Sequence, residues 1–213
     1  MSLSPDMKLQ PEERIALYGG LRQLGYVAGC LGIMFVQHAL AHVYHQDTFK
    51  ELHLVENLQF TLLVLSALVY FAFAAGQRAR RPLGWLLASF CLLAACREMD
   101  ILFDDCPFLS WKIGFVFPAA ALLHDIVCWP VFFRAALRFA SRPPCIMLIA
   151  AVIIIAVGQL VGHKPFLIDI LGPVDHVSRL KEIFEEGVET IGYFAILCAS
   201  IELFCTRQSY SAA

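Results

Sequence analysis

Six mostly apolar stretches run through this chain, and each is long enough for a helix to cross a bilayer, which takes about 20 residues. Inside a membrane the backbone must satisfy its own hydrogen bonds, so such stretches form helices. Charged residues make up only 16% of the chain, against roughly a quarter in soluble domains. We therefore predict an all-α, polytopic transmembrane bundle. The six spans are expected at residues 23–44, 54–76, 83–104, 113–136, 144–163 and 181–205.

Arginines gather in alternate loops, and this sets the expected orientation. The loops between spans two and three and between spans four and five contain Arg78, Arg80, Arg81, Arg134, Arg138 and Arg142. Because cationic loops stay in the cytoplasm, both termini are predicted to be cytoplasmic. Residues 1–22 are then a cytoplasmic leader, residues 23–206 the transmembrane domain and residues 207–213 a tail. We expect a multi-pass protein of a bacterial inner membrane.

Ionisable residues concentrate at the opposite, non-cytoplasmic end of the predicted spans. They are His38, His42 and His45 in span one, Glu56 in span two, Arg97, Glu98 and Asp100 in span three, and Glu182, Glu185, Glu186 and Glu189 in span six. At that depth an ionisable group costs several kcal/mol unless it is paired or hydrated, so these side chains should face a shared interior. The cytoplasmic half of the bundle is expected to be plain apolar scaffold.

The histidines of span one have the spacing of metal ligands. His38 and His42 are four residues apart, so both side chains lie on one helix face and can bind one ion. With Glu56 and Glu189 they form a mixed set that suits zinc or non-haem iron. The alternative is that these histidines lie at the interface and bind water and lipid headgroups.

Three further residues are candidate catalytic groups. Glu98 and Glu185 could each activate a metal-bound water, although acids in span six also simply stabilise the start of a helix. His124 lies near the middle of span four, between Pro118 and Pro130. In a functional role, His124 is the floor of an outward-facing cavity or a step in a proton relay. The alternative is a neutral histidine whose hydrogen bonds are satisfied by its neighbours.

One pair of residues is assigned a structural role. Arg97 and Asp100 are three residues apart on span three and are predicted to form an ion pair that fixes this helix against its neighbours.

Together these residues favour a metal-dependent membrane enzyme of the hydrolase type, acting on a lipid or another membrane-soluble substrate. The first alternative is a proton- or cation-translocating transporter or channel component, against which the apolar cytoplasmic half counts. The second is an accessory membrane subunit. The net charge of −2 provides no basic face, so we expect the lipid bilayer as a partner and no nucleic acid.

Overall fold

The structure is a computed structural model that describes residues 11–43, 54–99, 111–161 and 177–207. Within these ranges the chain forms seven α-helices, two short 3-10 helices and no strand, so the predicted all-α class is confirmed. The helices are α1 (Pro11–Val43), α2 (Leu54–Ala75), η2 (Arg78–Arg80), α3 (Arg81–Glu98), η3 (Trp111–Phe115), α5 (Val116–Val127), α6 (Trp129–Ala140), α7 (Pro143–Val161) and α9 (Val177–Cys205).

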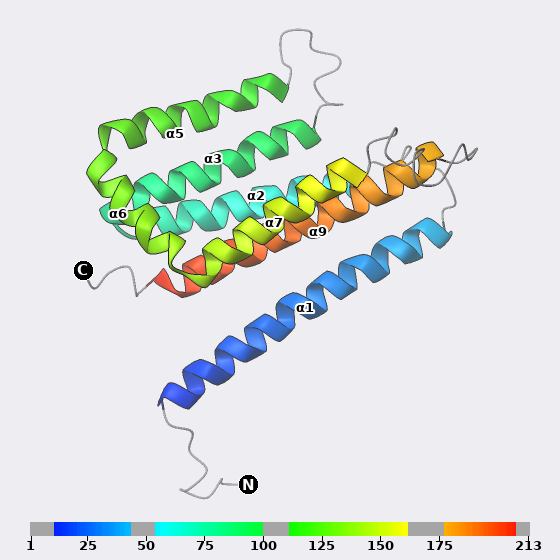
Figure 1. Cartoon of the computed structure of the whole chain (residues 1–213), viewed down its shortest axis with the longest axis horizontal. Helices are drawn as coiled ribbons and strands as arrows, with labels where there is room; N and C mark the ends of the chain where they lie inside the picture. The colour runs from blue at the N-terminus through cyan, green and yellow to red at the C-terminus, as the bar shows by residue number, and fades with distance from the viewer. Residues whose placement is uncertain (1–10, 44–53, 100–110, 162–176, 208–213) are drawn as a thin grey trace, which may run out of the picture.

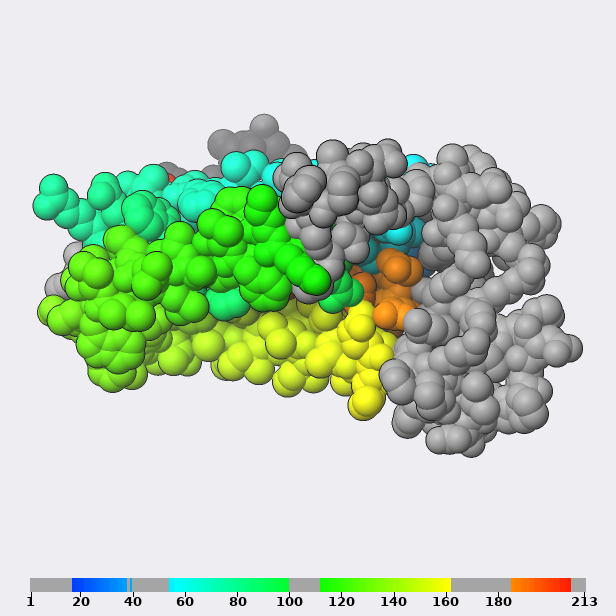
Figure 2. Space-filling view, turned by 90° about the horizontal axis from the view of Figure 1, so that it is seen from above, coloured from blue at the N-terminus to red at the C-terminus, as the bar shows by residue number. Residues whose placement is uncertain are grey.

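The long helices run up and down beside one another, and α9 lies at the centre (Figure 1). α9 packs against α7, α2 and α1, while α3 packs between α2 and α5. The helix α1 lies along the outside of α9, and α6 crosses one end of the bundle (Figure 1). Figure 2 shows a face on which α5, α7 and the α2–α3 pair leave only a short stretch of α9 visible, near one end.

Four of the described helices are long and apolar enough to cross a membrane. They are α1 through Leu17–Gln37, α2, α7, and α9 through Glu185–Cys205. The pair α5 and α6 would be a fifth span if its two parts are taken together. The described part of α3 contains three charged residues in 18, Arg81, Arg97 and Glu98, and does not meet the same test.

The fourth predicted span is broken. A bend of 108° separates the stretch Lys112–Val127 from α6, at Cys128. Pro130 in the first turn of α6 explains the break, because proline has no N–H to donate to the carbonyl four residues earlier and its ring crowds that carbonyl. The predicted fourth span, 113–136, is therefore divided between α5 and α6, and His124 lies in the last turn of α5.

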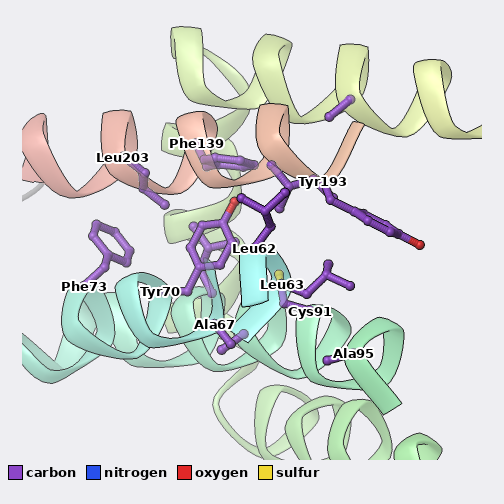
Figure 3. Packing of buried hydrophobic residues seen from close by; sticks show 14 of the residues in the cluster. Leu62, Leu63, Ala67, Tyr70, Phe73, Cys91, Ala95, Phe139, Tyr193 and Leu203 are labelled. Carbon is purple, nitrogen blue, oxygen red and sulfur yellow. The ribbon is translucent and has the colours of Figure 1, made fainter. Parts of the chain in front are cut away.

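The apolar core lies between α2, α3, α6, α7 and α9. Leu63, Tyr70, Phe73 and Leu203 are almost completely buried in it (Figure 3). The approach of α2 to α3 depends on Gly84, where an added Cβ would lie 2.7 Å from the Ala74 Cβ and 3.0 Å from the Tyr70 carbonyl oxygen. A side chain at this position would push the two helices apart.

Candidate functional site

A polar cluster lies where α2, α3, α7 and α9 meet, near one end of the bundle. We call it the carboxylate cluster; it comprises Gln59, Arg97, Glu98, Gln159, Glu186, Glu189, Thr190 and Tyr193. Glu189 is four residues from the start of the apolar stretch Glu185–Cys205. At 1.5 Å per residue this places it about 6 Å inside the end of that stretch.

Glu189 is the most enclosed carboxylate of the cluster. Its side chain is 2% exposed and accepts a hydrogen bond from Arg97 Nη2 at 3.0 Å. The amide of Gln159 on α7 donates to the same carboxylate oxygen. Arg97 itself is 48% exposed, so its guanidinium connects a buried acid to the edge of the bundle.

Glu98 lies beside this pair. Its Oε1 accepts a hydrogen bond of 2.8 Å from the Tyr193 hydroxyl and lies 3.8 Å from Arg97 Nε. Tyr193 is at the margin of the apolar core, with its hydroxyl pointing away from the other labelled side chains (Figure 3). The ring of Tyr193 therefore packs in the apolar core, while its hydroxyl hydrogen-bonds Glu98 in the carboxylate cluster.

The third carboxylate, Glu186, is bound by α2. Gln59 is fully buried, and its Nε2 lies 2.9 Å from Glu186 Oε2 and 3.1 Å from Thr190 Oγ1. The Thr190 hydroxyl donates back to the Glu186 carbonyl at 2.7 Å. The amide oxygen of Gln59 is also buried, yet it has no hydrogen-bond partner in the part of the chain that the structure describes. An acceptor of this kind can bind a donor or a cation.

Acids outnumber cations at this site. The cluster has three carboxylates, Glu98, Glu186 and Glu189, and one cation, Arg97, which contacts Glu98 and Glu189. Several uncompensated negative charges in a bundle interior are unfavourable, because burial removes the water that stabilises them. The cluster is therefore suited to hold a proton or to bind a positive ion.

The structure brings several of the predicted site residues to this end of the bundle. Glu98 and Glu189 both lie next to Arg97, at 3.8 and 3.0 Å between the nearest charged atoms. Glu56 and Glu185 are half-buried on the same ends of α2 and α9. Their roles as metal ligand and catalytic base stay predictions.

Other predicted residues lie outside the described side chains. These are His38 and His42, at the end of α1, and Asp100, which follows α3. The Arg97–Asp100 ion pair therefore stays a prediction, and Glu189 is an additional partner of Arg97 that the sequence did not reveal.

His124 lies far from the carboxylate cluster. Its ring centroid is 4.7 Å from that of Trp85, which is 13 residues before Glu98 on α3, or about 20 Å along the helix. Its Nδ1 lies 3.2 Å from Asp125 Oδ1, and its Nε2 lies 3.8 Å from Cys128 Sγ. The separation along α3 places His124 away from the acids of the carboxylate cluster, and its role as the floor of a cavity or as a proton relay stays a prediction.

A second polar contact lies in the half of the bundle that was expected to be purely apolar. Glu202 on α9 is buried and binds Arg22 of α1 through two hydrogen bonds, of 2.5 and 2.7 Å, while the Tyr26 hydroxyl is 3.3 Å away. That expectation is therefore wrong. In the sequence, the one indication of this contact is a single glutamate, Glu202, near the end of an apolar span. Its partner Arg22 is 180 residues earlier in the chain, so the sequence does not show that the two meet.

Gln159 is the other residue that sequence reasoning missed. It is an uncharged side chain in the most apolar span, so neither charge nor spacing distinguished it. In the described parts of the chain, no three His, Cys, Asp or Glu side chains are arranged to hold a metal ion. Comparison with known protein families, with curated proteins and with solved structures finds no match to this chain.

Proposed function

We propose that this protein translocates protons or cations across a membrane, and that the carboxylate cluster is its ion-binding site. The observation that carries the proposal is the excess of acids: Glu98 and Glu189 both contact Arg97, whereas Glu186 is bound only by the uncharged Gln59 and Thr190 among the described residues. Such a group reaches a favourable charge by taking up a proton or a cation, and it releases that ion when its surroundings change.

Polar groups in the other half of the bundle support the same function. Glu202 is 13 residues after Glu189 on α9, which corresponds to about 20 Å. Between the two acids the core contains the buried hydroxyls of Ser66, Tyr70 and Ser200. Ion-translocating membrane proteins use acids and hydroxyls in a bundle interior as successive binding positions.

The proposal includes a topology of six spans with both termini in the cytoplasm. Four described helices, and the broken α5–α6 pair as a fifth, are compatible with crossing a membrane. We take α3 as the sixth, because it lies between α2 and α5 along their length. The alternating arginine-rich loops then place the carboxylate cluster at the non-cytoplasmic end.

A metal-dependent hydrolase acting on a lipid is the second candidate. It is favoured by the position of α1, whose Gln37 Oε1 lies 3.7 Å from where a Cβ of Gly187 would be. The predicted ligands His38 and His42 follow directly on α1, toward the same end as Glu189. In this proposal zinc or non-haem iron is bound by these histidines with Glu56 and Glu189, and Glu98 or Glu185 acts as the base.

Ion flux in proteoliposomes tests the first proposal. Purified protein is reconstituted with a pH-sensitive dye trapped inside, and a potential is applied across the membrane. We expect dye acidification with the wild type, and loss of most of it with Glu189→Gln and with Glu98→Gln. Glu13→Gln, the same substitution at the far end of α1, is the matched control. A wild type with no flux of protons, sodium or potassium contradicts the proposal.

Elemental analysis separates the two candidates. A stoichiometric transition metal in purified wild type that is lost in His42→Ala and in Glu189→Ala, together with absent flux, establishes the hydrolase candidate instead. Flux that persists in metal-free protein supports translocation.

A further inference from the structure

Two neighbouring cavities lie far from the carboxylate cluster, on the α3–α5 side of the bundle, and share His124. The first has a volume of about 260 Å³ and lies between α2, α3 and α5, with Phe71, Trp85, Leu92 and Phe117 among its lining side chains. The second has a volume of about 390 Å³ and lies at the α2–α3 connection. Together they reach the size of small-molecule sites, roughly 300–1,000 Å³.

The two cavities differ in character. The first is lined almost entirely by aromatic and aliphatic side chains, whereas the second is lined by Arg78 and Arg81 together with Pro82 and Val131. The two cavities adjoin at His124, and we call the pair the α3–α5 groove, with a cationic mouth (the second cavity) and an apolar body (the first).

The two arginines at the mouth are available for an external anion. Both are exposed, and neither guanidinium group has a hydrogen bond or ion pair to any residue that the structure describes. Arg80, between them in sequence, is different: it is buried, and its Nη2 donates to the Arg207 carbonyl at 2.6 Å. Guanidinium groups bind phosphate with paired, charge-assisted hydrogen bonds.

His124 lies where the mouth meets the body. Its ring is held between Trp85, at 4.7 Å between centroids, and Asp125, whose Oδ1 is 3.2 Å from Nδ1. Asp125 is 2% exposed, and its second oxygen has no hydrogen-bond partner among the described residues. This contact keeps the imidazole at the junction, where it can hydrogen-bond a polar group that lies next to an apolar chain.

We propose that the α3–α5 groove binds an anionic phospholipid, with its phosphate at Arg78 and Arg81 and an acyl chain along Trp85 and Phe117. Charge complementarity at the mouth and an apolar body beside it are the two properties that this ligand requires, and they occur here in the correct order. The mouth is at the same end as the arginine-rich loops, so the lipid belongs to the leaflet on that side. The site is independent of the carboxylate cluster, about 20 Å away along α3.

Native mass spectrometry of delipidated protein tests the charged mouth. Phosphatidylglycerol and phosphatidylcholine with identical acyl chains are titrated against the wild type and two double variants. We expect about tenfold tighter binding of phosphatidylglycerol to the wild type, and loss of that preference in Arg78→Gln/Arg81→Gln. Arg134→Gln/Arg138→Gln, which removes two arginines of α6 outside the groove, is the control. An equal loss in both double variants means general surface attraction and overturns the proposal.

A second variant tests the apolar body without changing a charge. Ala120 lines the first cavity and is exposed, so Ala120→Phe fills the space while burying no new group in the core. We expect weaker binding of phosphatidylglycerol with an unchanged thermal unfolding temperature. Unchanged lipid binding in Ala120→Phe overturns the proposed position of the acyl chain.

A soluble anion distinguishes a lipid site from a plain phosphate site. Inorganic phosphate and glycerol phosphate are added as competitors at millimolar concentration. We expect neither to displace phosphatidylglycerol, because both lack the acyl chain that occupies the apolar cavity. Displacement by inorganic phosphate alone shows that the arginines bind a free anion and refutes the lipid assignment.

Discussion

Replacing Arg97 by glutamine removes the one cation that the carboxylate cluster contacts among the described residues. Its Nη2 is 3.0 Å from a Glu189 oxygen whose side chain is 2% exposed. Removing one partner of a fully buried ion pair costs about 3–5 kcal/mol. Because the Arg97 side chain is 48% exposed, water already screens much of this interaction, and we expect a loss of about 1–3 kcal/mol.

Thermal unfolding in detergent measures this loss. For a domain of this size, 1 kcal/mol corresponds to about 2–4 °C, so Arg97→Gln should lower the unfolding temperature by about 2–12 °C. A thiol-reactive dye is a suitable probe, since Cys91 and Cys198 are free and buried and become reactive only on unfolding. Arg134→Gln is the control, because this arginine is exposed on α6 and its Nε donates to the Pro130 carbonyl of its own helix rather than to a carboxylate.

The double variant Arg97→Gln/Glu189→Gln provides the decisive comparison. Neutralising Glu189 removes the buried charge that Arg97→Gln leaves uncompensated. The double variant should therefore lose less stability than the two single variants lose together. We expect a coupling energy of about 1–2 kcal/mol, within the range for contacting residues. Strict additivity, or an Arg97→Gln loss no larger than that of Arg134→Gln, refutes the view that Arg97 compensates the cluster.

Three further predictions concern packing and topology. Gly29→Leu should move α1 away from α9, because an added Cβ at this position overlaps the Phe194 ring. Gly32→Leu faces open space and should leave α1 in place. Distances between spin labels on α1 and α9 measure the displacement. Gly84→Ala should cost about 1–3 kcal/mol, seen as a lower unfolding temperature, since the Tyr70 carbonyl is 3.0 Å from the new Cβ and belongs to rigid backbone. Reporter domains fused to each terminus should both be cytoplasmic; opposite sides would mean an odd number of spans.

The helices could be predicted from the sequence because their length and apolar character are local properties. The second predicted span, 54–76, is α2 (Leu54–Ala75), and the fifth, 144–163, is α7 (Pro143–Val161). The break at Cys128 could not be located from length and apolar character. Pro118 and Pro130 are both in the predicted fourth span, but Pro118 is in the first turn of α5, where its missing N–H costs nothing. Pro130, in contrast, comes shortly after the end of α5, where a further helical turn would need its N–H.

The site could be located from the sequence but not assembled. The positions of Glu98, Glu186 and Glu189 along their spans place them at one end of the bundle, since this depends only on the direction of each helix. It does not give the rotation of one helix against the next, which is set by the packing of apolar side chains far from the site. For this reason Arg97 was paired within its own helix, with Asp100, whereas the structure also places it against Glu189 on α9.

The same packing indicates which part of the bundle is easiest to move. α9 is held against α7 at Gly192, where an added Cβ overlaps Ile155, so shifting that pair disturbs a close backbone contact. In contrast, none of the span of α1 is buried, and its described contacts with α9 are confined to one stripe that includes Arg22 and Gly29. A helix held along one stripe loses few contacts when it shifts. The proposed translocation requires an ion site that opens in turn to each side. Among the helices that pack against α9, α1 is the one whose displacement loses the least packing.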